Sequence, residues 1–129
     1  MKEIWKDIEG YEGLYQISNF GRVKSLPKKN GNSYQEERIL KPKNNQGYMQ
    51  VNLYKNKKCK SIVIHRMVAK AFIKNEYNKR EVNHIDGNKA NNRADNLEWC
   101  TPSENQKHAY RIGLKGRRKE KIKWYLEYV

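Results

Sequence analysis

Residues 82–108 read VNHIDGNKANNRADNLEWCTPSENQKH, and this stretch decides which fold we expect. Residues 81–85 (EVNHI) alternate like a short strand, and Asp86-Gly87-Asn88 after it is a typical turn sequence. A loop rich in Asn and Asp follows, and residues 97–100 (LEWC) predict a second short strand.

A helix is predicted directly after the second strand. Thr101 and Glu104 have the spacing of a capping box, and Pro102 stands at the first helical position. We expect the helix to run to about residue 112, with Gly113 as its C-cap. The predicted order is therefore strand, loop, strand, helix.

Four side chains converge if the first strand packs against this helix. Asn105 and His108 are three residues apart on the helix and share a face, which would then meet Asn83 and His84 of the strand. Such a set suits an oxygen-preferring cation such as Mg²⁺, which keeps several waters and binds substrate phosphate. A neutral histidine is then free to deprotonate a water molecule.

The first half of the chain predicts a small antiparallel β-sheet with irregular loops. Residues 28–34 are interpreted as a polar loop, and residues 65–73 change to a helical period with an apolar stripe. The strand-like segments are residues 14–18, 22–26, 38–42, 48–54 and 59–64. One face of such a sheet is left for solvent or a ligand.

The charge balance indicates a polyanionic partner. The chain has 28 Lys+Arg against 14 Asp+Glu, a formal net charge of +14 and a pI near 9.8. Nucleic acid is the usual partner of basic domains of this kind; the alternatives are a basic chain that is merely soluble and one that binds anionic membranes. The candidates for DNA contacts are Arg22, Lys24, Lys41, Lys43, Lys55, Lys57, Arg66, Lys107, Arg117 and Arg118.

The motifs of this chain resemble a known family. Those that carry the resemblance are Asn83-His84, Asp86-Gly87-Asn88, Asn91-Asn92, Asn96-Leu97-Glu98-Trp99 and Thr101 to Asn105. Together they resemble the HNH endonucleases of the phage and intron homing type, and residues 65–72 (HRMVAKAF) match what precedes the motif there. The segments WKDI, GYEG, YQISN and GRVKS within residues 5–25 resemble the N-terminal module, NUMOD4-like, that is often fused to these nucleases.

The resemblance implies an α+β chain with a ββα-metal fold and one divalent ion, Mg²⁺ or alternatively Mn²⁺. By motif position, His84 would be the general base, Asn105 a metal ligand, and Asn96 the residue that holds the long loop in place. Asn83 stands where relatives often carry a metal-ligating Asp. His108 has no fixed role in the family; it contacts the scissile phosphate, assists the metal or lies near the site.

The amide at position 83 leaves two interpretations open. An amide oxygen is a neutral ligand and attracts a hard cation less than a carboxylate does. The chain is either a metal-dependent endonuclease that nicks or cleaves double-stranded DNA, or a DNA-binding protein with an impaired nuclease site. Because His84, Asn96 and Asn105 are all present, we favour the enzyme.

We expect three parts in the chain: a DNA-binding β-sheet module at residues 1–62, the nuclease domain at residues 63–113, and a basic tail or helix at residues 114–129. The last part either contacts DNA phosphates or is a solvated segment. No dimer motif is visible, so we expect a monomer, with a dimer as the alternative.

The remaining features exclude other classes. No apolar run is long enough to span a bilayer, and the N-terminus lacks the apolar core of a signal peptide. We therefore expect a cytoplasmic protein of a bacterial host cell, encoded by a phage or a mobile element. Cys59 and Cys100 form no C-x-x-C pair, so neither a zinc site nor a disulfide is expected.

Overall fold

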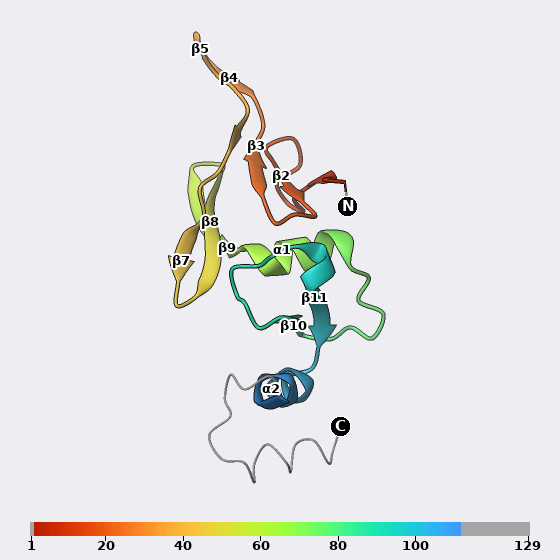
Figure 1. Ribbon diagram of the computed structural model, residues 1–129. Coiled ribbons are helices and arrows are strands. Elements are labelled where there is room, and N and C mark those ends of the chain that lie inside the picture. The colour runs from red at the N-terminus through yellow and green to blue at the C-terminus, as the bar shows by residue number, and fades with distance from the viewer. Residues whose placement is uncertain (1, 112–129) are drawn as a thin grey trace.

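Helix α1 (Ile64–Phe72) lies at the centre of the fold, with N-terminal strands on one side and the pair β10–β11 on the other (Figure 1). The computed structural model of the protein describes residues 2–111. Met67 and Val68 of the predicted apolar stripe are buried, while Ala71 and Phe72 are partly buried against the same core. The helix therefore provides the surface on which both halves of the chain pack.

The N-terminal sheet has the strand order β1-β2-β3-β6 and is antiparallel throughout. Its strands are β1 (Trp5–Asp7), β2 (Tyr15–Ser18), β3 (Val23–Ser25) and β6 (Arg38–Ile39). Ile17 and Val23 are paired across β2 and β3 and are almost fully buried, so their alternation sets the core face. The strands predicted around the turn at residues 19–21 are confirmed.

The prediction of a polar loop at residues 28–34 is wrong. This segment forms an antiparallel hairpin of β4 (Lys28–Asn30) and β5 (Ser33–Gln35), which projects from the body of the molecule (Figure 1). Its side chains are exposed or half-buried, and Tyr34 is 65% exposed. A hairpin whose two faces both meet water has no apolar alternation to reveal it.

A second antiparallel sheet joins β7 (Lys43–Asn45), β8 (Tyr48–Lys55) and β9 (Lys58–Val63). Val51 and Leu53 of β8 are buried, as expected from their alternation. The last strand ends at Val63, and Ile64 already belongs to α1.

The second half of the chain has the predicted order of strand, loop, strand and helix. These elements are β10 (Glu81–His84), the short helix η1 (Ala94–Asn96), β11 (Leu97–Cys100) and α2 (Pro102–Arg111). Strands β10 and β11 pair antiparallel, with Asn83 opposite Glu98 and His84 opposite Leu97. The expected helix end at Gly113 and the tail at residues 114–129 lie outside the described residues.

One hydrophobic cluster connects the two halves. It contains Ile17 and Leu53 from the N-terminal sheets, Val68 from α1, and Val82 and Leu97 from β10 and β11. The expected boundary between residues 62 and 63 falls at the end of β9, directly before the helix on which both halves pack. None of the helices within residues 2–111 has the length and apolar character needed to cross a membrane.

Candidate active site

A cleft of about 780 Å³ lies between β10, the loop after it, the start of α2 and the turn between β7 and β8. Asn83, His84, Asn105 and His108 all line it. The structure therefore brings the four residues that were expected to converge to one cleft.

The side chain of Asn83 is held by a carboxylate on the neighbouring strand. Its Nδ2 donates a hydrogen bond to Oε1 of Glu98 at 2.9 Å, and Asn83 is only 6% exposed. A carboxylate only accepts hydrogen bonds, so this contact identifies which end of the amide is nitrogen. The amide oxygen is the end that is left for a ligand.

Asn105 is held in the same way. Its Nδ2 donates to Oε1 of Glu81 at 3.0 Å, which fixes the α2 side chain against strand β10. The capping box that starts α2 is present, because Glu104 N donates to Thr101 Oγ1 at 3.1 Å and Thr101 N donates to Glu104 Oε1 at 2.9 Å. This cap sets the phase of the helix and hence the position of Asn105 one residue later.

His84 is buried and bonded through one ring nitrogen. Its Nε2 lies 2.8 Å from Oδ1 of Asn92, an oxygen that accepts, so we assign the ring proton to Nε2. Nδ1 is then the nitrogen with a free electron pair. Burial lowers the pKa of His84, Lys89 acts in the same direction, and the Asn92 hydrogen bond and Asp86 oppose both. The ring is therefore neutral near pH 7 and able to accept a proton.

The rings of His65 and Tyr48 lie beside His84. The centroids of His65 and His84 lie 4.9 Å apart, Tyr48 stacks on His65 at 5.2 Å, and Lys89 Nζ lies 4.4 Å from the Tyr48 centroid. Burial, together with the nearby His84, lowers the pKa of His65 to about 4. Its Nδ1 is buried without a hydrogen-bond partner among the described residues. His65 is thus a neutral packing partner of His84, contributed by the first turn of α1.

Asn96 holds the loop after β10 through three hydrogen bonds. Its Oδ1 accepts from Asp86 N at 3.0 Å, and its Nδ2 donates to Asp86 Oδ1 and to Asn91 O, each at 2.9 Å. These bonds connect both ends of the loop to the start of β11. Asn96 itself does not line the cleft.

His108 connects α2 to the end of β10. Its Nε2 lies 2.8 Å from the backbone oxygen of Ile85, and since a carbonyl only accepts, this nitrogen carries the proton. The bond holds the second turn of α2 at the cleft.

The residues expected to contact DNA fall into three groups. Some are engaged within the protein: Arg22 pairs with Glu3, Lys24 with Glu37 at 3.5 Å, Lys55 Nζ donates to Gly10 O at 2.6 Å, and Arg66 donates to Arg80 O at 2.8 Å. Lys41, Lys43 and Lys57 are exposed, and Lys107 is half-buried on α2. Arg117 and Arg118 lie outside the described residues.

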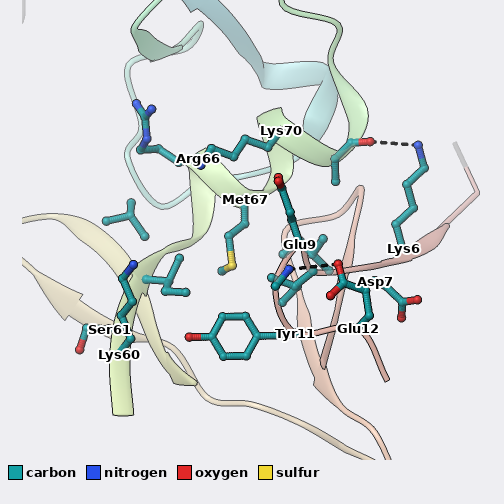
Figure 2. A pocket seen from close by; sticks show the side chains of 16 residues that line it. Lys6, Asp7, Glu9, Tyr11, Glu12, Lys60, Ser61, Arg66, Met67 and Lys70 are labelled. Carbon is teal, nitrogen blue, oxygen red and sulfur yellow. Dashed lines mark hydrogen bonds between the residues drawn. The ribbon is translucent and has the colours of Figure 1, made fainter. Parts of the chain in front are cut away.

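A second hollow, of about 750 Å³, lies between residues 6–12, β9 and α1 (Figure 2). Met67 projects into it from α1, and its rim carries charges of both signs, including Glu9, Glu12 and Lys60. Arg66 lines this hollow and not the first cleft. The hollow contains none of the histidines and asparagines of the motif.

A cysteine or carboxylate metal centre is not found in the described part of the chain. No group of three or more His, Cys, Asp and Glu side chains is placed to hold an ion there. Both cysteines are free; Cys100 is buried and Cys59 is exposed. Among the side chains that line the first cleft, Asn83 and Asn105 offer amide oxygens to an ion.

Four residues near the cleft were not predicted from the sequence as members of the site: Tyr48, Glu81, Asn92 and Glu98. The strand register could have identified Glu98, since it stands opposite Asn83 once the two strands are paired. Tyr48 comes from a different sheet, and no local signal in the sequence connects it to His84.

The fold is that of an HNH endonuclease, as the comparisons with known proteins show. The HNH endonuclease family matches residues 63–107, and the NUMOD4 motif matches residues 3–54. The chain is homologous to the HNH homing endonuclease I-HmuI and to related HNH endonucleases.

Three of the similar proteins show the extent of the match. The uncharacterized HNH endonuclease L247 of Acanthamoeba polyphaga mimivirus is 46% identical over 112 residues, which is 83% of this chain and 26% of that protein. DNA endonuclease I-HmuI of Bacillus phage SP01 is 43% identical over 101 residues, 78% of this chain and 54% of the phage protein. The putative homing endonuclease YosQ from the SPbeta prophage of Bacillus subtilis is 48% identical over 69 residues, 53% of this chain and 40% of that protein.

A solved structure has a similar fold. The structure of I-HmuI, described as showing DNA binding and cleavage by this HNH homing endonuclease, matches with a TM-score of 0.70 and 34% identity. The match covers 96% of this chain and 66% of that chain. The chain spans about half or less of the full length of the three relatives named above.

Proposed function

We propose that the protein is a metal-dependent DNA endonuclease that hydrolyses phosphodiester bonds of double-stranded DNA, with His84 as the general base. The observation that carries the proposal is the single cleft that contains a neutral histidine and two amides anchored by carboxylates. The homology to HNH endonucleases supports the same reaction.

The donor set of the cleft fits a hard divalent ion such as Mg²⁺, or Mn²⁺ in its place. Asn83 and Asn105 both commit their amide nitrogen to a glutamate, which leaves two oxygens as ligands. Oxygen ligands are what Mg²⁺ prefers, and few of them suffice because water and substrate phosphate complete its coordination. Glu81 and Glu98 add negative charge next to these amides, although neither amide is itself charged.

In this proposal His84 takes the proton of the attacking water through Nδ1. Its hydrogen bond to Asn92 holds the ring in the tautomer that leaves this nitrogen free. A bound ion would stabilise the charge that develops on the phosphate and on the leaving oxygen. Asn96 holds the loop beside His84, and His108 holds α2 at the cleft.

Binding of DNA is proposed to rest on the basic surface. Among the described candidates, Lys41, Lys43 and Lys57 are exposed and can reach phosphates, while Lys107 is half-buried on α2 and also has an interaction within the protein. Arg22, Lys24, Lys55 and Arg66 have contacts within the protein and would have to give them up or share them. Phosphate contacts supply affinity that falls with salt and carries no sequence information.

The alternative is a DNA-binding protein whose nuclease site is impaired through Asn83. It is disfavoured because the Asn83 side chain is held in a fixed orientation: its Nδ2 donates a hydrogen bond to the Glu98 carboxylate at 2.9 Å. The two relatives from a Bacillus phage and a prophage support an origin in a phage or mobile element, as expected.

Cleavage of supercoiled plasmid tests the proposal. The wild-type protein is expected to give nicked or linear product with Mg²⁺ or Mn²⁺ and none with EDTA. The His84→Ala variant is expected to lose about 100-fold or more in rate, because general-base catalysis contributes at least that much. If His84→Ala cuts as fast as wild type, the assignment of His84 is wrong.

A further inference from the structure

The turn between β2 and β3 lies against the loop that carries Asn92. We refer to residues 19–21 as the docking turn. Its Asn19 O accepts a hydrogen bond from Ala94 N at 2.8 Å, and the ring of Phe20 lies 4.4 Å from the guanidinium carbon of Arg93. The N-terminal sheet therefore touches the nuclease half beside its active site.

Gly21 makes the closest approach of the docking turn. A Cβ added there would lie 2.8 Å from the backbone oxygen of Asn92, 2.9 Å from its Cβ and 3.0 Å from its carbonyl carbon. Ordinary contacts begin at 3.4 Å, so any larger residue must displace Asn92 by about 0.6 Å. Glycine is required here for this approach as well as for its φ of +85°.

Asn92 is the residue that bonds the proposed base. It is 6% exposed, and its Oδ1 lies 2.8 Å from Nε2 of His84. A chain of direct contacts thus runs from Gly21 through Asn92 to His84.

Hydrogen bonds within the N-terminal part of the chain hold the docking turn in place. The hydroxyl oxygen of Ser18 accepts hydrogen bonds from the backbone N–H groups of Phe20 and Arg22, each at 3.2 Å. The side chain of Asn19 accepts from Ile4 N at 2.8 Å and donates to Lys2 O at 3.0 Å. Both side chains are buried, so the turn is a rigid surface for the loop to rest on.

We propose that the docking turn is a positioning element of the active site: Gly21 seats Asn92 so that His84 keeps its proton on Nε2 and its electron pair on Nδ1. The N-terminal module is then part of the nuclease centre and not only a DNA contact. The inference rests on the proposed role of His84 in cleavage.

The test compares Gly21→Ala with Gly10→Ala. Gly10 has a φ of +84° and nothing within 4 Å of an added Cβ, so it reproduces the backbone strain without the contact to Asn92. The tautomer of His84 is read in the metal-free, full-length protein from the ¹⁵N shifts of its ring, which is practical because the chain has only 3 histidines. Single-turnover nicking of plasmid and DNA affinity are measured on the same samples.

The wild type and Gly10→Ala are expected to keep His84 in the Nε2–H form. Gly21→Ala is expected to give a mixture of tautomers and to slow nicking by up to about 100-fold with DNA affinity unchanged, because small displacements at a reacting group are that costly. In an Asn92→Ala background, Gly21→Ala should cause no further loss of rate, since both changes act through one contact.

An unchanged tautomer and rate in Gly21→Ala overturn the inference, and so does an equal loss in Gly10→Ala. If Gly21→Ala does not fold, Phe20→Ala carries the test, because it removes the Arg93 contact without adding a side chain at positive φ. A tautomer mixture in Phe20→Ala then supports the inference, and a wild-type tautomer overturns it. Failure of the proposed function would appear separately, as His84→Ala protein that cuts like wild type.

Discussion

Replacing Asn83 with Asp tests the contact that most affects the proposed metal site. The substitution introduces a second carboxylate where the Asn83 amide nitrogen lies 2.9 Å from Glu98 Oε1. Two unit charges at that separation repel by about 1.4 kcal/mol in bulk water and by about 6 kcal/mol at an effective dielectric constant near 20. Because Glu98 is exposed and Asn83 is buried, we expect a value toward the lower end, about 2 kcal/mol, together with loss of the hydrogen bond.

Urea unfolding of the metal-free protein near pH 8 measures this cost. Asn83→Asp should lower the free energy of unfolding by about 2 kcal/mol, whereas Glu98→Gln alone should have little effect because its amide oxygen still accepts from Asn83. The double variant should regain most of the loss, since a glutamine amide can donate to the new carboxylate.

Added manganese should offset part of the stability that Asn83→Asp loses. Asn83→Asp offers a charged oxygen to the ion, so added Mn²⁺ should stabilise this variant more than it stabilises the wild type. The reasoning is refuted if Asn83→Asp leaves the metal-free stability unchanged, or if the effects of the two substitutions simply add.

Three further predictions concern stability and DNA binding. The pKa of His65 is lowered to about 4 in the folded protein, so the unfolded chain binds more protons between that value and pH 6.5. Urea unfolding should therefore show the free energy of unfolding falling by about 2 kcal/mol from pH 7 to pH 5. His65→Phe should remove this part of the pH dependence, and an unchanged pH dependence would contradict the prediction. Thr101→Ala should cost about 1 kcal/mol in thermal unfolding through loss of the capping box, and a cost near zero would mean that the cap does not stabilise α2. In DNA titrations at several salt concentrations, Lys43→Ala should reduce the slope of log affinity against log salt by about 1. Lys24→Ala should reduce this slope by less, because Lys24 is already paired with Glu37. Equal effects of the two substitutions would show that the pairing does not matter.

Much of the fold follows from local sequence signals. The strand at Glu81–His84, the turn at Gly87 and the capping box at Thr101 are each encoded within a few residues, and all three are present. The hairpin at residues 28–35 was missed because both of its faces meet water, which leaves no apolar alternation to detect.

The partners within the site could not be predicted from the motif. Glu98 reaches Asn83 through strand register, and Glu81 reaches Asn105 only because α2 packs back on β10. Tyr48 comes from another sheet, and its stacking on His65 depends on how that sheet meets α1. Such contacts arise from tertiary packing, and no periodicity in the sequence predicts them.

Chemical rescue of His84→Ala is the most direct test of the central claim. Single-turnover nicking of supercoiled plasmid is measured with Mg²⁺, with and without added imidazole. If the His84 ring removes the proton of the attacking water, the variant should be slow alone, and imidazole should restore part of the rate in proportion to its neutral form. A variant that nicks at the wild-type rate without imidazole would contradict the account.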